Sequence, residues 1–235
     1  MNAFKFCVTF VRSAVFAIVF YGLTVPWVIA SAIAGWMGQR PMLLVVKGWG
    51  WMHRLSCRWI LGQKITMIGT LPKEPMLFIF KHESMFETAD LLCLFDAPTI
   101  GAKQELLDIP GWGWIARRHG VIAIQRTAGA KALRYLQKEA VKSVKAGRPI
   151  CLFPEGTRVP HGEQPPLRSG FAALYALLKL PVVPVAVDSG RLSPRNSFLK
   201  KPGTITYKVG EIVPPGLPRA EAEERVHRAI NALNE

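Results

Sequence analysis

Cysteines and acidic residues are both scarce in this chain of 235 residues. Its four cysteines lie far apart, at Cys7, Cys57, Cys93 and Cys151. They have neither the paired spacing of a zinc site nor the density of a disulfide scaffold, so we expect ordinary reduced thiols. Sixteen acidic residues stand against 30 lysines and arginines, a net charge of +14. This excess predicts an anionic partner, either nucleic acid or a phospholipid surface.

Charge is absent from a long stretch near the N-terminus. No residue in 13–39 is charged, and a helix of that length, at about 1.5 Å per residue, crosses a hydrocarbon core of roughly 30 Å. A cleaved signal peptide is the competing interpretation, because residues 30–32 resemble a cleavage site. The apolar run nevertheless exceeds the usual signal core of about 7 to 15 residues. The stretch therefore predicts membrane attachment.

The residues that follow also favour a membrane interface. Tryptophans alternate there with cations, a mixture that suits the headgroup region; they are Lys47, Trp49, Trp51, Arg54, Arg58 and Trp59. A soluble helix that uses the same residues as core is the alternative. The positive charge after the apolar run predicts that the rest of the chain lies on the cytoplasmic side of the inner, cytoplasmic membrane. We assign residues 1–62 to membrane-anchoring helices; Pro26 allows a kinked hairpin, so spanning and monotopic attachment both stay open.

From residue 63 onward, short apolar runs alternate with amphipathic helices, which is typical of an α/β domain. The runs expected to form strands are 65–68, 76–80, 121–124, 150–153, 182–187 and 204–209. Helical spacing predicts helices over 133–144, 169–179 and 219–234. We see no repeat, low-complexity tract or second domain boundary. Residues 63–235 are thus predicted to form one catalytic domain, with a mostly parallel central sheet flanked by helices.

The first motif with catalytic side chains pairs His82 with Glu87. His82 follows the apolar run 76–80 at its carboxyl end, where ligand sites of open α/β sheets gather. Inside one helix the two side chains would point about 140° apart, so the pair requires His82 in a loop and Glu87 in the first helical turn. The carboxylate would then hold the Nδ1 proton and leave Nε2 free as a general base. Two solvated loop residues are the alternative for this motif taken alone.

The second motif, Phe-Pro-Glu-Gly-Thr-Arg at residues 153–158, also follows an apolar strand. Its proline and glycine favour a type I turn that leaves backbone N–H groups available to an anion. Arg158 can clamp phosphate oxygens through two parallel hydrogen bonds. Arg126, after the run 121–124, and Arg168, before the helix of 169–179, are the second and third candidates for phosphate contact. One arginine is more often a surface charge, but three near one sheet edge favour a phosphate site.

With these motifs the chain resembles the glycerolipid acyltransferase family typified by 1-acyl-sn-glycerol-3-phosphate acyltransferases. That family carries a His-x4-Asp block, a Gly-x-x-Phe-Ile-Asp-Arg-like block, a Phe-Pro-Glu-Gly-Thr-Arg block and a late Val-Pro-Val block. This sequence matches them in order at residues 82–87, 120–126, 153–158 and 183–185, and the third block is identical. Two positions depart from the pattern: Glu87 replaces the usual aspartate, and Gln125 replaces the acid before the arginine.

The resemblance implies transfer of an acyl group from acyl-CoA or acyl carrier protein to the sn-2 hydroxyl of 1-acyl-sn-glycerol 3-phosphate (lysophosphatidic acid), which gives phosphatidic acid. His82 would activate the hydroxyl with support from Glu87, without a metal or other cofactor. Pro184 would belong to the block that shapes the acyl-chain site. The residues that would bind phosphate and glycerol are Arg126, Glu155, Gly156, Thr157 and Arg158.

Three other functions compete with this one. Acyltransferases that act on another lyso-lipid, such as a lyso-ornithine lipid, share these blocks, although the arginines favour a phosphate-bearing acceptor. A catalytically silent, lipid-binding membrane adaptor is the second. Charge alone suggests a nucleic-acid binder, but the sequence has no recognised binding motif and its charge is spread out. We therefore expect membrane phospholipids, the acyl donor and lysophosphatidic acid as partners, and not nucleic acid.

Overall fold

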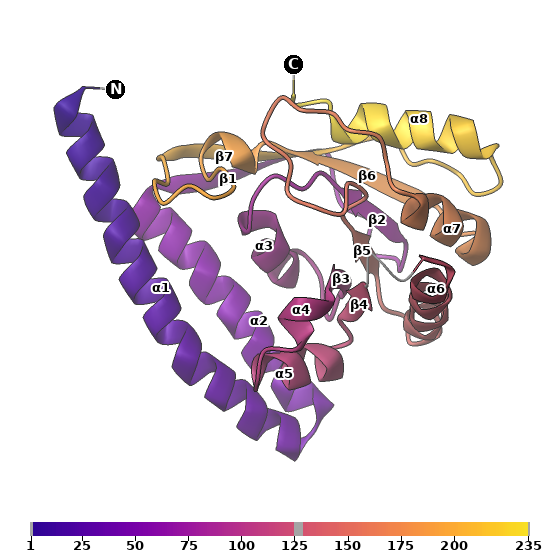
Figure 1. Ribbon diagram of the computed structural model, residues 1–235, viewed down its shortest axis with the longest axis horizontal. Helices are drawn as coiled ribbons and strands as arrows, with labels where there is room; N and C mark the ends of the chain where they lie inside the picture. The colour runs from indigo at the N-terminus through magenta and orange to yellow at the C-terminus, as the bar shows by residue number, and fades with distance from the viewer. Residues whose placement is uncertain (1, 125–128, 235) are drawn as a thin grey trace.

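The computed structural model describes residues 2–124 and 129–234 (Figure 1). Within them, seven strands form one sheet in the order β1-β7-β6-β2-β5-β3-β4. All neighbouring strands are parallel except β6 and β7. The predicted α/β class, with a mostly parallel sheet flanked by helices, is confirmed. The strands are β1 (Gln63–Ile68), β2 (Leu77–Phe80), β3 (Thr99–Lys103), β4 (Ile122–Ile124), β5 (Ile150–Leu152), β6 (Val182–Val187) and β7 (Gly203–Val209).

Two features of the sheet do not follow from the apolar runs in the sequence. Strand β3 is not among the expected strands, because Thr-Ile-Gly-Ala-Lys contains no continuous apolar run; it pairs in parallel with β4 and β5. Strands β6 and β7 are antiparallel because their connection contains only a short 3₁₀ turn, Ser189–Arg191. A parallel pair is usually joined by a crossover that contains an α-helix, and this connection contains none.

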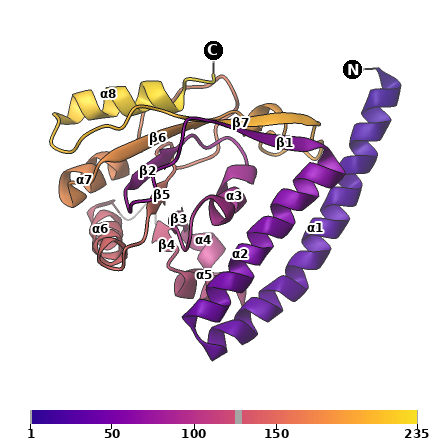
Figure 2. The ribbon, with the colours of Figure 1, turned by 180° about the vertical axis from the view of Figure 1, so that it is seen from behind.

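Helices cover both faces of the sheet. They are α1 (Ala3–Met37), α2 (Gln39–Ser56), α3 (Phe86–Leu94), α4 (Gln104–Leu107), α5 (Trp112–His119), α6 (Gly129–Lys145), α7 (Ser169–Leu178) and α8 (Arg219–Ile230). Figures 1 and 2 show α6, α7 and α8 on one side of the sheet, and α3 on the other with α1 and α2 outside it.

Strand β2 explains why both faces are covered. Its side chains alternate between the two faces, as strand geometry requires. Phe78 and Phe80 pack into the core on the side of α1–α3, whereas Leu77 and Ile79 pack into the core on the side of α6–α8. All four are fully buried, so β2 lies at the centre of the molecule and presents its carboxyl end at the middle of one sheet edge.

Helices α1 and α2 form an antiparallel helical hairpin (residues 3–56) that runs along the domain (Figures 1 and 2). Gly38 between them has a φ of 144°, which glycine adopts readily. From α2, Arg54 donates to both oxygens of the buried Asp90 in α3, at 2.6 and 2.8 Å. The Tyr207 hydroxyl of β7 donates to the same carboxylate at 2.9 Å. This buried ion pair fixes the helical hairpin onto the domain.

The outer face of the helical hairpin is apolar. Among the described residues, α1 is the one helix long and apolar enough to cross a membrane, and Pro26 lies inside it without ending it. Exposed large side chains on the helical hairpin and the turn after it include Phe4, Ile18, Ile33, Trp36, Leu44 and Trp59. The other face of α2 buries Met42 and His53. The segment of alternating tryptophans and cations thus contributes core on one face and exposed apolar surface on the other.

Stability should fall in mild acid because His119, the last residue of α5, is buried. Burial, and after it the nearby Arg148, lower the pKa of His119 from 6.5 to about 4. In the unfolded chain His119 is protonated below pH 6.5, whereas in the folded chain it is protonated only below about pH 4. Between pH 7 and pH 5 this difference should remove about 2 kcal/mol from the free energy of unfolding.

Urea unfolding in detergent, followed by tryptophan fluorescence at both pH values, measures this loss. His119→Gln should reduce the loss by about 2 kcal/mol, while His227→Gln, a half-buried histidine of α8, is the matched control. A His119→Gln protein that loses as much stability as the wild type would contradict the assignment.

Candidate active site

His82 and Glu87 meet at the carboxyl end of β2. His82 lies in the loop that leaves the strand, and Glu87 lies in the first turn of α3. The Nδ1 atom of His82 is 2.9 Å from Oε1 of Glu87. This is the arrangement that their spacing requires, and the longer glutamate side chain reaches the ring from the start of the helix.

Glu87 is fully buried, and all its polar contacts are hydrogen-bond donors. Oε1 also accepts from the backbone amides of Glu83 and Ser84, both at 2.7 Å. Oε2 accepts from the hydroxyls of Ser84 at 2.9 Å and Ser189 at 2.6 Å. Burial alone would raise the pKa of Glu87, but the hydrogen bonds from His82, Ser189 and Ser84 hold this pKa below its ordinary value. The carboxylate is therefore ionised at neutral pH.

An ionised Glu87 fixes the tautomer of His82. Because a carboxylate only accepts hydrogen bonds, the proton of the neutral imidazole lies on Nδ1 and Nε2 keeps its lone pair. The ring also stacks on Phe153, with centroids 4.1 Å apart and planes at 22°. This geometry suits a general base whose protonated form is stabilised by a buried carboxylate.

The Phe-Pro-Glu-Gly-Thr-Arg hexapeptide follows β5 and forms a tight turn. The Gly156 amide closes it with a 3.0 Å hydrogen bond, at a φ of 67° that favours glycine. The Val159 amide then donates to the His82 carbonyl at 2.7 Å. This bond holds the hexapeptide against the His82 loop, so the side chains of Thr157 and Arg158 line the same cavity as His82.

Glu155 differs from the expectation that it contacts substrate. Its side chain is 1% exposed and points into the interior, where Oε1 lies 3.4 Å from Nζ of Lys81. Burial raises the pKa of Glu155 despite the nearby Lys81 and His82. Lys81 is also fully buried and donates to the Asn231 side chain at 2.7 Å. The inward direction of Glu155 therefore follows from the buried ammonium of Lys81, which a neighbouring carboxylate stabilises.

The other sequence-predicted residues lie around the hexapeptide or away from it. Arg168 donates from Nε to the Glu155 carbonyl at 3.0 Å and covers Gly156. It therefore stabilises the turn from its outer side. Pro184 is buried within β6 and is not one of the described residues that line the cavity. Arg126 lies outside the described residues.

The cavity beside His82 has a volume of about 510 Å³ and extends between the helical hairpin, α5 and β3. Much of its wall is apolar and includes Phe20, Trp27, Trp49, Leu92, Ile100 and Ile115. Lysine and arginine line it at Lys103, Arg158 and Arg195, and no described acidic residue does. Sequence reasoning missed Lys103 because β3 was not expected, and Arg195 because it lies in the irregular β6–β7 connection.

Comparison with known proteins identifies the family. A protein-family model described as Acyltransferase matches residues 63–188, more than half of the chain. The chain belongs to the acyltransferase family. The 1-acyl-sn-glycerol-3-phosphate acyltransferase of Pseudomonas aeruginosa is 33% identical over 193 residues, which cover 81% of this acyltransferase and 72% of that protein. The lyso-ornithine lipid O-acyltransferase of the same organism is 28% identical over 202 residues, 77% of this chain and 75% of that protein.

A solved structure shares the fold of the acyltransferase. The crystal structure of the 1-acyl-sn-glycerophosphate acyltransferase of Thermotoga maritima matches with a TM-score of 0.69 at 23% identity, covering 97% of this chain and 93% of that one. The family match begins at Gln63, the first residue of β1. Phe16 and Leu61 nevertheless pack into one core with Phe78 and Phe80, so the division after residue 62 stays a prediction.

Glu87→Gln should inactivate the acyltransferase. The amide would remove the charge that stabilises protonated His82 and would place an N–H donor among groups that also donate. We expect kcat to fall about 100-fold or more, while Glu87→Asp keeps part of the activity. Steady-state kinetics of purified variants measure the effect, with Glu74→Gln, an exposed loop position, as control. A wild-type kcat in Glu87→Gln would remove Glu87 from the mechanism.

Proposed function

We propose that the acyltransferase transfers a fatty acyl group from acyl-CoA or acyl carrier protein to the sn-2 hydroxyl of 1-acyl-sn-glycerol 3-phosphate and forms phosphatidic acid. One observation carries this proposal: His82, a base held by a buried carboxylate, lies beside Arg158 in the wall of an apolar cavity. The base can accept the proton of a hydroxyl, the guanidinium can bind a phosphate, and the apolar cavity can hold an acyl chain. The guanidinium of Arg158 also favours this phosphate-bearing acceptor over a lyso-ornithine lipid.

The reaction is an acyl transfer without a covalent enzyme intermediate. Nε2 of His82 accepts the proton of the sn-2 hydroxyl as its oxygen attacks the carbonyl carbon of the thioester. The new C–O bond forms while the carbonyl electrons move to oxygen and give a tetrahedral oxyanion. When the oxyanion collapses, the C–S bond breaks and the thiolate takes the proton back from His82. Glu87 stabilises the imidazolium between these steps, and no metal or other cofactor is needed.

The oxyanion needs hydrogen-bond donors. The Gly156 amide is used to close the turn, whereas the Thr157 amide makes no hydrogen bond to any residue that the structure describes. The Thr157 side chain lines the cavity, and its Oγ1 accepts from Arg195 at 3.2 Å. We therefore assign the Thr157 amide as an oxyanion donor, next to His82.

A direct assay tests the function. Detergent-purified protein is given lysophosphatidic acid and a radiolabelled acyl group on CoA or, separately, on acyl carrier protein, with His82→Ala as control. We expect labelled phosphatidic acid from the wild type with at least one donor and none from His82→Ala. Folded wild-type protein that makes no phosphatidic acid with either donor would reject the proposed acceptor.

We further propose that the protein attaches to the cytoplasmic face of the membrane from one side. The N-terminal half of α1 is bound to the domain: Arg12 donates to the Ile60 carbonyl at 2.6 Å, and the Lys200 amide donates to Ser13 at 2.9 Å. The other end of α1 packs against α5. A helix crossing the bilayer would lose one set of these contacts. The exposed apolar side chains would instead enter one leaflet, with neighbouring cations near anionic headgroups.

Terminal tags distinguish monotopic attachment from a membrane span. Peptide tags at both ends of the full chain should be cleaved by protease in inside-out vesicles from expressing bacteria, and neither should be cleaved in spheroplasts. An N-terminal tag that is cleaved only in spheroplasts would show that α1 crosses. A soluble cytoplasmic protein and a periplasmic protein serve as controls for vesicle orientation.

A further inference from the structure

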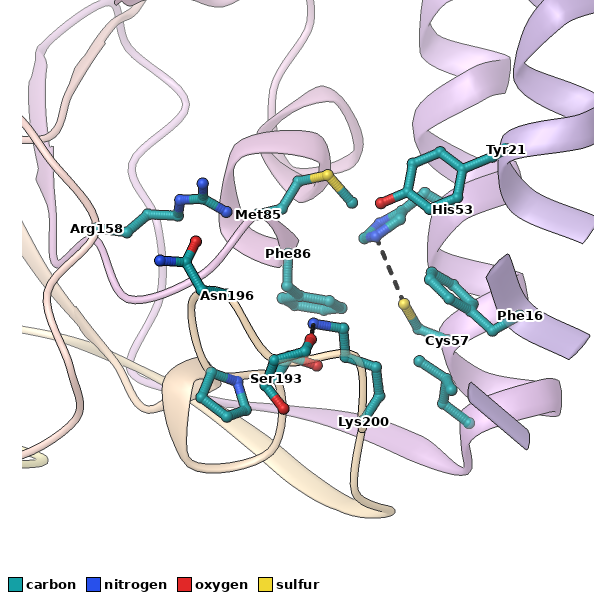
Figure 3. A pocket seen from close by; sticks show the side chains of 13 residues that line it. Phe16, Tyr21, His53, Cys57, Met85, Phe86, Arg158, Ser193, Asn196 and Lys200 are labelled. Atoms are coloured by element: carbon teal, nitrogen blue, oxygen red, sulfur yellow. Dashed lines mark hydrogen bonds between the residues drawn. The ribbon is translucent and has the colours of Figure 1, made fainter. Parts of the chain in front are cut away.

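A second, smaller cavity lies on the other side of Arg158. Its volume is about 220 Å³, and residues of α1, α2, the start of α3 and the β6–β7 connection line it (Figure 3). Tyr21, Met85 and Arg158 line both cavities, so the two spaces share a wall. The smaller cavity is therefore next to the active site but outside the apolar space assigned to an acyl chain.

The lining of the smaller cavity is largely polar on one side. Figure 3 shows Arg158 and Asn196 on one side, and Phe16 and His53 on the other. Lys200 also lines the cavity, and no described acidic residue does. A cavity lined by two cations and by no described carboxylate has the chemistry of an anion site.

Lys200 is held in place by the fold. Its backbone amide donates to Ser13 of α1, and its Nζ donates to the Ser197 carbonyl at 2.9 Å. Neither Lys200 nor Arg158 forms an ion pair with an acidic residue in the described part of the chain. Burial, and after it the charge of Arg158, lower the pKa of Lys200. Two like charges thus lie close together in a partly buried site, and an anion between them would relieve the repulsion.

We propose that the smaller cavity binds the phosphate of the lysophosphatidate acceptor, between Lys200 and Arg158, and that Lys200 determines specificity for a phosphate monoester. This inference rests on the proposed function. A phosphate monoester carries a charge of about −1.5 to −2 at pH 7, which two cations match. Arg158 directly precedes Val159, whose amide binds the His82 carbonyl, so a phosphate there keeps the glycerol within reach of the base. A volume of about 220 Å³ is large enough for a glycerol phosphate.

Acceptor kinetics test the role of Lys200. Lys200→Gln should raise the KM for lysophosphatidic acid about tenfold or more, since it removes a charge-assisted hydrogen bond, and should leave the KM for the acyl donor unchanged. Lys200→Arg should restore most of the affinity. Lys201→Gln is the matched control, because it removes the same charge from an exposed neighbouring side chain. Melting temperatures confirm that each variant is folded.

Three kinetic outcomes are informative. An unchanged acceptor KM in folded Lys200→Gln would overturn the proposal, and so would a rise in the donor KM alone, which would assign the site to a donor phosphate. An equal rise in the acceptor KM for Lys200→Gln and Lys201→Gln would show that general surface charge causes the rise, and this result would also overturn the proposal.

A binding measurement separates this proposal from the proposed reaction. Glycerol 3-phosphate should raise the melting temperature of His82→Ala protein, and Lys200→Gln in that background should abolish the rise while Lys201→Gln preserves it. If the wild-type protein makes no phosphatidic acid, the proposed reaction is wrong, but the phosphate site can still be tested because binding of glycerol 3-phosphate needs no turnover. Equal stabilisation of both variants by glycerol 3-phosphate would reject the phosphate site alone.

Discussion

Glu87 is a carboxylate without solvent contact, and the structure around it has to supply hydrogen-bond donors. A buried charge left without partners costs roughly 3–5 kcal/mol, so every neighbour of Glu87 has to donate. Two amides and a hydroxyl come from the loop after β2, and another hydroxyl comes from Ser189 after β6. Strands β2 and β6 therefore have to be neighbours, and α3 has to start directly after the loop. The same contacts orient the ring of His82.

The helical hairpin lines the candidate active site and also carries the exposed apolar surface that we propose attaches to the membrane. Phe20, Trp27 and Trp49 line the larger cavity, and Tyr21 lines both cavities. The buried pair of Arg54 and Asp90 holds these walls against α3, the helix that carries Glu87. The exposed apolar surface and the walls of the two cavities are thus on opposite sides of the same two helices. Such an arrangement suits substrates that reach the site from the membrane.

Much of this site could be predicted because its key spacing is local. His82 and Glu87 are five residues apart, and the hexapeptide forms its turn within six residues, so short-range geometry decides both. The direction of Glu155 could not be predicted, because it depends on the buried Lys81, which lies 74 positions earlier in the chain. Lys103 was missed for a related reason: β3 has little hydrophobic pattern of its own and becomes a strand by pairing with β4 and β5.

The sequence by itself determined the α/β class, six of the strands, the placement of His82 and Glu87, and the apolar N-terminal helix. Hydrophobic periodicity and short spacings carry that information, because secondary structure follows from residues close together in the chain. Only the tertiary structure decided that α1 and α2 line the cavity beside His82, that Glu155 faces inward, and that Arg158 and Lys200 share a cavity. These features depend on contacts between segments far apart in sequence, which no local pattern records.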